Sequence, residues 1–163
     1  MNEAARKERN RQRLTECFPK FAKRVEAVIK DMEAQGFRPR IQDAHRTIAD
    51  QLIAFKNGNS KTKFGFHNIT GVGGKPESLA VDLIDDDKPL NPTRKYMILL
   101  AGAAQAHGLH SGIFFLPPAF HTAINKAIAE NNFSPAIKIG FDPTHIEATG
   151  VTIAEAKAGK RPS

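Results

Sequence analysis

The chain has 163 residues, 40% of them hydrophobic, which is enough apolar material for one core and predicts a single domain over residues 1–163. Its formal net charge is +7, and it has no Trp and one cysteine, Cys17. An intramolecular disulfide, a CxxC zinc site and a thiol redox pair are therefore excluded, so any bound metal must be held by His, Asp or Glu. No stretch approaches the ~18 apolar residues that a membrane span needs.

The positive charge is concentrated at the N-terminus. Residues 1–24 carry three acidic residues against eight basic ones, which are Arg6, Lys7, Arg9, Arg11, Arg13, Lys20, Lys23 and Arg24. A basic end predicts a polyanionic partner such as an anionic membrane face, an anionic cell wall or nucleic acid. The alternative is that residues 1–17 form a solvated, partly frayed leader that only aids solubility.

The first third of the chain predicts a helix followed by an extended segment. Residues 1–13 are charged, and we expect them to be helical or disordered. From residue 18 to residue 32 apolar side chains recur at steps of three and four, which predicts a helix, and Gly36 suits its C-terminal end. The segment FRPRIQDAHR, residues 37–46, favours extended backbone.

The middle of the chain predicts a helix, a long loop and a buried strand. Residues 47–58 have the pattern of a second helix, with three apolar residues expected to face inward: Ile48, Leu52 and Phe55. Residues 57–78 are rich in Gly, Asn and Ser and are expected to form a loop. The run LAVDLI, residues 79–84, has the composition of a buried strand.

The last third predicts two helices and a hairpin. Asn91 and Pro92 suit the N-cap and first position of a helix that runs to about residue 107. A short helix is expected over residues 119–131, two short strands joined by a turn over 136–148, and a loose tail over 154–163. Because helices and strands mix without regular βαβ alternation, we predict an α+β fold in which helices flank a small, mainly antiparallel sheet.

Two histidines, and a carboxylate that lies within an apolar run, indicate a metal site. His67 lies in the glycine-rich segment KFGFHNITGVGG, and His145 lies in FDPTHIE, three residues after Asp142. Asp82 interrupts the apolar run LAVDLI, where a carboxylate is costly to bury unless it is paired or bound to metal. Two imidazoles and one carboxylate form a common ligand set for catalytic zinc. Asp142 or Glu147 could then act as the general base on zinc-bound water.

Simpler interpretations remain open on spacing alone. FDPTHIE can be a polar turn that leads into an edge strand, and Arg46 can form a surface ion pair with Asp43 or Asp50. His107 and His110 straddle a predicted helix end and are interpreted as structural. The acidic run at residues 85–87 indicates a solvated turn, with a calcium site as the alternative.

The order of these motifs resembles a known family of zinc peptidases. The motifs occur in the order HRT, Gln51, His67, the AVD that ends at Asp82, and DPTHIE. In this order they resemble the D-alanyl-D-alanine carboxypeptidase and L-alanyl-D-glutamate endopeptidase family. These enzymes cut peptidoglycan stem peptides and include many phage endolysins, and the likeness spans roughly residues 18–150. It implies a Hedgehog/DD-peptidase-like fold and a bound Zn²⁺.

The resemblance also implies a role for each matching residue. His67, Asp82 and His145 match the zinc ligands. Asp142 matches the catalytic acid and base, and Arg46 matches the cation that steadies the substrate and the developing oxyanion. Three further residues match positions that bind substrate or support the ligands: Gln51, Ser60 and Glu147.

The chain departs from the family pattern in three places. Fifteen positions separate His67 from Asp82, about twice the usual interval, and residues 71–78 have the character of an insertion. Gly65 stands where the family often has Ser. The family's Trp near the end is absent, so the wall of the substrate cleft is not defined by the resemblance.

Asp rather than Glu at position 142 favours cleavage between L-Ala and D-Glu, as in phage-type endolysins. A D-Ala-D-Ala carboxypeptidase on the same fold is the alternative within enzymes, and a non-catalytic zinc-binding or nucleic-acid-binding module is the alternative outside them. We expect no nucleic acid partner, because no nucleic-acid motif is present and the cations are not interleaved with aromatic residues.

The N-terminal sequence and the resemblance together suggest where such an enzyme is made and where it acts. The basic N-terminus lacks an apolar h-region, so no secretory signal is visible. We expect a monomer that is made in the cytoplasm of the host cell and acts on the cell wall after holin-type release. Its basic N-terminus is expected to contact anionic membrane lipids or lipopolysaccharide.

Overall fold

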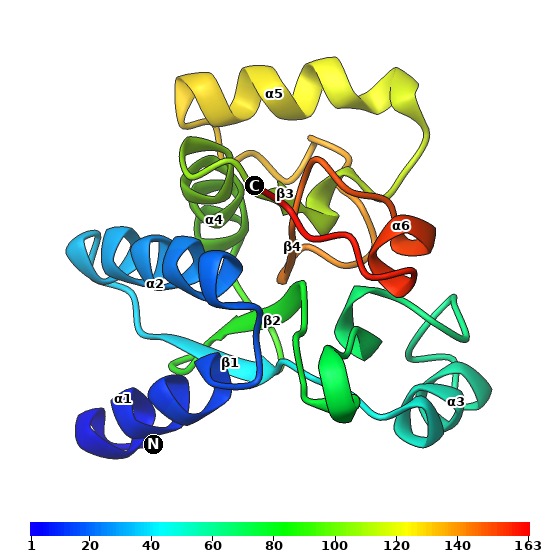
Figure 1. The fold of residues 1–163 in the computed structure, drawn as a ribbon. Coiled ribbons are helices and arrows are strands. Elements are labelled where there is room, and N and C mark those ends of the chain that lie inside the picture. The colour runs from blue at the N-terminus through cyan, green and yellow to red at the C-terminus, as the bar shows by residue number, and fades with distance from the viewer.

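A four-stranded antiparallel sheet with the strand order β1-β2-β4-β3 forms the centre of the protein (Figure 1). The computed structural model describes all of residues 1–163. The strands are β1 (Pro39–Asp43), β2 (Ala80–Asp85), β3 (His110–Ser111) and β4 (His145–Glu147). The α+β class and the small antiparallel sheet are thus confirmed.

Six α-helices surround this sheet. They are α1 (Glu3–Leu14), α2 (Pro19–Ala34), α3 (Ile48–Lys56), α4 (Arg94–Ala106), α5 (His121–Glu130) and α6 (Ile153–Lys157). In Figure 1, α5 runs along the top, α4 and α2 lie below its left end with α1 at the lower left, and α3 and α6 lie at the right. None of the helices is long and apolar enough to cross a membrane.

The main core lies where α2 and α4 meet the sheet. The predicted apolar stripe of α2 is buried, with Val28 and Met32 fully covered, and Pro19 opens the helix at a position where its missing N–H costs nothing. Gly36 has a φ of +87°, as the predicted helix end requires. Tyr96 of α4 donates a hydrogen bond of 2.8 Å to the Leu83 carbonyl, which joins this helix to β2.

The register of the central strand brings distant residues together. β2 pairs with β1 on one side and with β4 on the other, and Asp82 lies opposite Asp43 in the first pair and opposite His145 in the second. The pairing with β1 is irregular between Ile41 and Asp43. The end of β1, the middle of β2 and the start of β4 therefore meet at one place.

The expectation that α3 buries an apolar face is wrong. Ile48, Leu52 and Phe55 are 57%, 36% and 37% exposed, and the only buried side chain of this helix is Gln51. An apolar stripe is buried only where another apolar surface lies opposite it, and α3 instead packs through a polar residue on the loop that follows it. The helix itself forms where predicted, with Thr47 as its N-cap.

Two predicted boundaries also differ from the structure. α4 begins at Arg94 rather than at Pro92, because the cap is Thr93, whose hydroxyl accepts from the Tyr96 N–H, and not Asn91. Residues 136–148 contain one strand rather than two. The segment before β4 is irregular backbone, fixed by a hydrogen bond of 2.6 Å from the Gly140 N–H to the Ile113 carbonyl.

The C-terminal segment, expected to be loose over residues 154–163, is held in place. Most of α6 lies within it, and Thr152 and Glu155 form a capping box at the helix start. Beyond the helix, Arg161 donates to the Glu77 carboxylate at 2.7 Å and to the Thr70 carbonyl at 2.8 Å. This contact ties the chain end to the 71–78 loop.

The N-terminal helix is part of the fold, so the alternative of a frayed leader is wrong. Arg6 is only 1% exposed and donates to the Pro39 carbonyl at 2.6 Å and to the Glu33 carboxylate at 2.8 Å. Arg9 donates to the Ile41 and Gln42 carbonyls, both at 2.9 Å. These arginines connect α1 to β1 and α2, so part of the N-terminal charge serves the structure.

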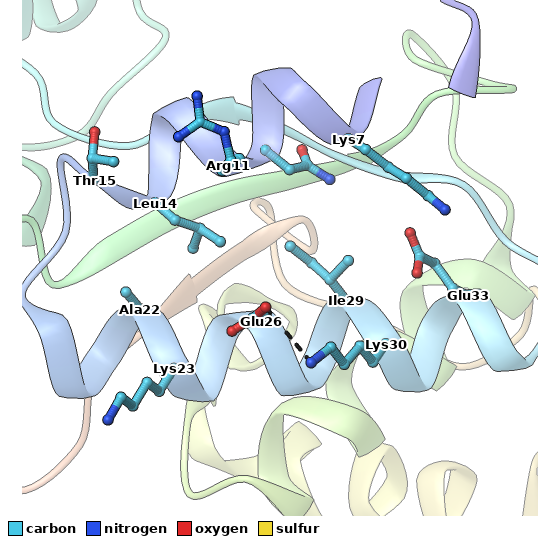
Figure 2. Close-up of a pocket in the computed structure, with 11 residues that line it drawn as sticks. Lys7, Arg11, Leu14, Thr15, Ala22, Lys23, Glu26, Ile29, Lys30 and Glu33 are labelled. Atoms are coloured by element: carbon cyan, nitrogen blue, oxygen red, sulfur yellow. Dashed lines mark ion pairs between the residues drawn. The ribbon is translucent and has the colours of Figure 1, made fainter. Parts of the chain in front are cut away.

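A groove of about 530 Å³ separates α1 from α2 (Figure 2). Leu14, Ala22 and Ile29 supply its apolar surface, and charged side chains of both helices border it. One ion pair, Lys30 with Glu26 at 3.6 Å, spans a turn of α2. The groove contains no His and no cluster of carboxylates that could hold a metal.

The buried position of Arg6 predicts that Arg6→Ala destabilises the protein by about 2–4 kcal/mol, because it removes the ion pair of the Glu33 carboxylate and one of the two side-chain donors to the Pro39 carbonyl, leaving only Asn10. Urea denaturation measures this loss. The matched control is Arg11→Ala on the same helix, whose side chain is 68% exposed and paired only with Glu8. An exposed ion pair of this kind contributes little to stability, so this variant should lose much less than Arg6→Ala, and equal losses in the two variants would contradict a structural role for Arg6.

Candidate metal centre

Three side chains converge where β1, β2 and β4 meet. His67 lies on a short 3₁₀ helix, Phe66–Asn68, Asp82 in the middle of β2, and His145 at the first position of β4. One ligand atom from each lies within 4.8 Å of the others, and the three residues form a group that can hold a metal ion. The structure therefore brings together the ligands that the sequence predicted.

The separations within this group suit a tetrahedral ion. His67 Nε2 lies 3.5 Å and His145 Nδ1 lies 3.3 Å from the same oxygen, Asp82 Oδ1. Two ligands bound tetrahedrally at ~2.0–2.1 Å would be about 3.4 Å apart. A donor set of two imidazole nitrogens and one carboxylate is one that Zn²⁺ takes at catalytic sites, with a fourth position left open. The residues present therefore fit the predicted zinc.

Hydrogen bonds on the far side of each imidazole fix which nitrogen faces the site. His67 Nδ1 is 2.6 Å from the Ala44 carbonyl, to which it donates, so its Nε2 is left as the free acceptor. His145 Nε2 is 2.8 Å from a Glu147 oxygen, which leaves Nδ1 toward Asp82. Such contacts set ring orientation and raise ligand basicity. Glu147 thus occupies the supporting position that the resemblance implied.

The same contacts shift the pKa values of the site. Burial would raise the pKa of Asp82, but the two imidazoles beside it hold that pKa well below its usual range. Burial would lower the pKa of His145, but hydrogen bonds to Asp82 and Glu147 raise it to about 10. The carboxylate charge is therefore firmly held and attracts positive charge to this point.

Asp142 lies beside the group but outside it. Its Oδ2 is 3.9 Å from His145 Nδ1, and 40% of its side chain is exposed to the cleft. Burial, and then the negative charge of Asp82, raise the pKa of the Asp142 carboxyl. A carboxyl with a raised pKa at the edge of a metal group is suited to accept and return a proton. Since Glu147 is bound to the far nitrogen of His145, Asp142 is the better placed of the two acids considered.

Arg46 forms an ion pair with Asp43 and also lies beside the metal group, so both interpretations of this residue apply. Its Nη2 forms the predicted ion pair with Asp43 at 2.6 Å, and the same nitrogen lies 3.5 Å from Asp82 Oδ2. The side chain is 18% exposed and lines the cleft. Asp43 therefore holds the guanidinium against the metal group, where a positive charge can meet an incoming carbonyl oxygen.

Gln51 connects Arg46 to the loop after α3. Its side-chain oxygen accepts from Arg46 Nη1 at 2.9 Å, and its side-chain nitrogen donates to the Ser60 hydroxyl at 2.8 Å and to the Thr62 carbonyl at 2.7 Å. The residue is 2% exposed. Gln51 and Ser60, implied by the resemblance to lie near the site, both line the cleft.

The cleft has a volume of about 370 Å³ and holds all of the predicted site residues. The structure adds an aromatic wall that the sequence analysis left undefined. The Phe115 ring lies 5.4 Å from the His145 ring and 5.6 Å from the Phe141 ring, between ring centres. In the sequence, this wall is signalled by the FF pair of FFLPP and by the Phe that opens FDPTHIE. A Phe that lines a cleft cannot be distinguished from a core Phe by sequence alone.

Other ionisable groups of interest lie outside the cleft. His107 pairs with Asp31 at 2.7 Å, and His121 lies 2.9 Å from the Phe114 carbonyl, in keeping with structural roles. In the acidic run at 85–87, Asp86 is neither a solvated turn residue nor part of a calcium group. It pairs with Arg40 at 2.7 Å and is 4% exposed.

The 71–78 insertion does not displace the ligands. Gly71 donates to the Lys75 carbonyl at 2.7 Å, and Thr70 and Pro76 form an antiparallel bridge, so the extra residues close into a small loop. Leu79 then donates to the Phe66 carbonyl at 3.0 Å, which returns the chain to the level of His67. The long interval between the first two ligands is accommodated as a loop outside the site.

Comparison with known proteins finds no matching family model and no matching curated protein. Among solved structures, the chain is similar to the L-Ala D-Glu endopeptidase ChiX of Serratia marcescens, with 15% identity, a TM-score of 0.49 and 86% of each chain covered. It is also similar to a mutant of the vancomycin resistance D,D-pentapeptidase VanY from a VanB-type cassette, solved with Zn(II). That match has 15% identity, a TM-score of 0.42, and covers 85% of this chain and 74% of the other. Similarity at this level does not by itself establish a shared activity.

A close backbone contact positions the turn that carries Asp142. A Cβ on Gly112 would lie 2.0 Å from the Asp142 carbonyl oxygen, and a Cβ on Gly140 would lie 2.5 Å from the Gly112 carbonyl oxygen. Gly112→Ala should therefore push the 140–145 segment away, with a loss of about 1–3 kcal/mol in stability and weaker metal binding. Denaturation and zinc titration measure both effects.

The control is Gly102→Ala in α4, where the nearest atom is a movable methyl of Ile128 at 3.3 Å. A glycine in a helix interior costs about 0.5–1 kcal/mol relative to alanine, so this variant should change stability by less than about 1 kcal/mol and leave metal binding unchanged. Normal stability and metal affinity in Gly112→Ala would show that the turn is not held by this contact.

The three hydrogen bonds of Gln51 predict that Gln51→Leu loosens the loop after α3. The substitution keeps the volume but leaves one Arg46 N–H without its acceptor and the Thr62 carbonyl with the Ser60 hydroxyl as its remaining side-chain donor, so we expect a loss of about 1–3 kcal/mol and faster proteolysis within residues 57–63. Gln12→Leu is the control, since that exposed side chain bonds only to Glu8. Unchanged cleavage of the loop in Gln51→Leu would argue against its role as the connector.

Proposed function

We propose that this protein is a zinc-dependent peptidoglycan hydrolase that cleaves the stem peptide. The observation that carries the proposal is the His67–Asp82–His145 group with a fourth ionisable residue, Asp142, beside it in an open cleft. A structural zinc site is usually closed by four protein ligands, whereas a catalytic one has three. The order of sequence motifs supports the same class, as a DD-peptidase-like fold of the Hedgehog type.

The residues of the cleft can divide the work of peptide hydrolysis among them. Zinc held by the three ligands supplies Lewis-acid activation of water and of the peptide carbonyl. Asp142 accepts the proton of the attacking water and returns it to the leaving amine. Arg46, held by Asp43, places positive charge toward the oxyanion that develops on the carbonyl oxygen. Glu147 keeps the His145 ring in its orientation throughout.

The bond that we propose is the one between L-Ala and D-Glu, as in phage-type endolysins. The support is the presence of Asp rather than Glu at position 142, which is an association within the resembling family. On this proposal the protein is made in the cytoplasm of the host cell and reaches the wall after holin-type release. Cleavage of D-Ala-D-Ala by the same cleft is the second candidate, because its catalytic groups would be the same.

The cations of the N-terminal region that have no role in the fold are available for an anionic surface. Lys7 and Lys23 are exposed and border the groove between α1 and α2 (Figure 2). Cations near an anionic membrane contribute about 1 kcal/mol each. We propose that this face of the monomer contacts anionic lipid or lipopolysaccharide, with no nucleic acid partner.

The proposed roles predict different outcomes for ligand and base variants. His145→Ala and Asp82→Ala should lose both zinc and activity, because each removes one of three ligands. Asp142→Ala should retain one zinc per chain and lower kcat/KM on purified peptidoglycan by about 10²–10⁴-fold. Metal analysis and mass spectrometry of the released ends on the same samples measure these effects. His107→Ala, outside the cleft, is the control and should retain both zinc and activity.

The released ends decide between the candidates. New N-terminal D-Glu ends support endopeptidase action, and release of terminal D-Ala places the protein among carboxypeptidases. Zinc without any cleavage would indicate a binding module. A wild type with neither zinc nor cleavage would overturn the proposal.

A further inference from the structure

The cleft contains two cations, Arg46 and Lys61, and their charges are differently engaged. Arg46 is paired with Asp43 at 2.6 Å and faces Asp82 at 3.5 Å. The ammonium of Lys61 has no carboxylate of the protein within ion-pair distance. It lies instead 4.0 Å from the centre of the Phe141 ring. Lys61 is thus the cation of the cleft whose charge is left for a ligand.

The position of Lys61 is defined by contacts on two sides. On one side, Gln51 holds the backbone of the Lys61 loop through the Ser60 hydroxyl and the Thr62 carbonyl. On the other, the ammonium lies over Phe141, whose ring packs on Phe115. A cation over an exposed ring is held by only about 0.5–1 kcal/mol, and its N–H donors remain available. The ammonium is therefore placed without being neutralised.

The aromatic wall connects this ammonium to the metal group. The Phe141, Phe115 and His145 rings lie in sequence at centre-to-centre distances of 5.6 Å and 5.4 Å. A peptide lying along this wall with a carbonyl at the metal group would extend toward Lys61. The positive charge of a bound metal and of Arg46 is taken up by the carboxylates beside them and by that carbonyl, so a free carboxylate elsewhere on the peptide needs a cation of its own.

We propose that Lys61 and the Phe141 face form a subsite for a free carboxylate of the substrate, in the same cleft as the metal group. This inference rests on the proposed peptidase function and adds the charge of the substrate to it. A stem peptide carries two such carboxylates. One is the α-carboxylate of a D-Glu linked through its side chain, and the other is the terminal carboxylate of the peptide.

The test measures binding separately from cleavage. The Asp142→Ala protein, loaded with zinc, binds stem peptides in a calorimeter without consuming them. One pair of peptides has either D-Glu or its α-carboxamide, and a second pair has either a free or an amidated C-terminus. In the D-Glu pair or in the C-terminal pair, we expect the carboxylate form to bind about tenfold more tightly. Lys61→Met in the same background should abolish that preference, and Lys61→Arg should retain most of it.

Lys63→Met is the matched control. Lys63 belongs to the same loop and is equally exposed, but its ammonium lies 5.4 Å from the Phe55 ring of α3 and does not line the cleft. This variant should keep the full preference for the carboxylate. If Lys61→Met keeps it as well, or if the parent protein binds acid and amide equally, the subsite is overturned.

Wild-type turnover of the same peptides separates this failure from that of the proposed function. Cleavage of acid and amide at equal rates would overturn the subsite and leave the peptidase standing. A wild type that binds and cleaves none of the peptides would overturn both. The peptide pair in which the preference appears identifies which carboxylate Lys61 receives.

Discussion

The half-buried carboxylate of Asp82 is the constraint around which the other parts of this structure are arranged. It lies in the central strand of the sheet, where an isolated charge would be costly, and so it requires positive partners on several sides. The register of β4 supplies His145 directly opposite, the 3₁₀ helix Phe66–Asn68 supplies His67, and the end of β1 leads to Arg46. Each partner comes from a different part of the chain, so the sheet must be complete before the charge is satisfied. The cost of one buried charge thus favours the correct strand register.

The two sides of the cleft are built differently. On the sheet side, His145 and Asp142 are fixed by strand pairing and by the close approach of Gly112, where no side chain fits. On the side of α3, the cleft is formed by a loop that depends on the single amide of Gln51. The exposed apolar residues of α3 show that this helix has little core beneath it. The metal group therefore lies on the side that the sheet fixes, and Lys61 lies on the side that α3 and its loop form.

The sequence was informative where chemistry restricts the choice of residue. A carboxylate within an apolar strand and histidines in glycine-rich or turn segments indicated the three members of the metal group, and the resemblance in motif order then selected them. Helices α2 to α5 and three of the four strands were also recognisable from periodicity and composition, whereas α1 was left open between helix and disorder and α6 was not predicted. These signals are local, and they report what a segment requires without reporting what lies opposite.

The predictions that the structure overturned concern segments whose surroundings are set by distant parts of the chain. The apolar pattern of α3 was taken as a buried face, but no apolar surface meets it. The order of the C-terminal segment depends on Arg161 reaching Glu77, 84 positions earlier in the chain. Phe115 and Phe141 could not be assigned to the cleft wall, because Phe serves cores and binding surfaces alike. Long-range contacts decide these cases, and a single sequence carries little trace of them.

Contacts within the fold also determine which cations remain available to a partner. The excess of cations in residues 1–24 indicated a polyanionic partner, yet Arg6 and Arg9 are engaged by carbonyls and carboxylates of the protein itself. Net charge therefore overstates what a surface can offer to a ligand, and only unpaired cations count toward recognition. In the cleft this distinction separates Arg46, whose charge is held by two aspartates, from Lys61, whose charge meets only an aromatic ring. A cation that the fold positions but does not neutralise retains its electrostatic interaction for a ligand, and that is why the proposed carboxylate subsite is built on Lys61 rather than on Arg46.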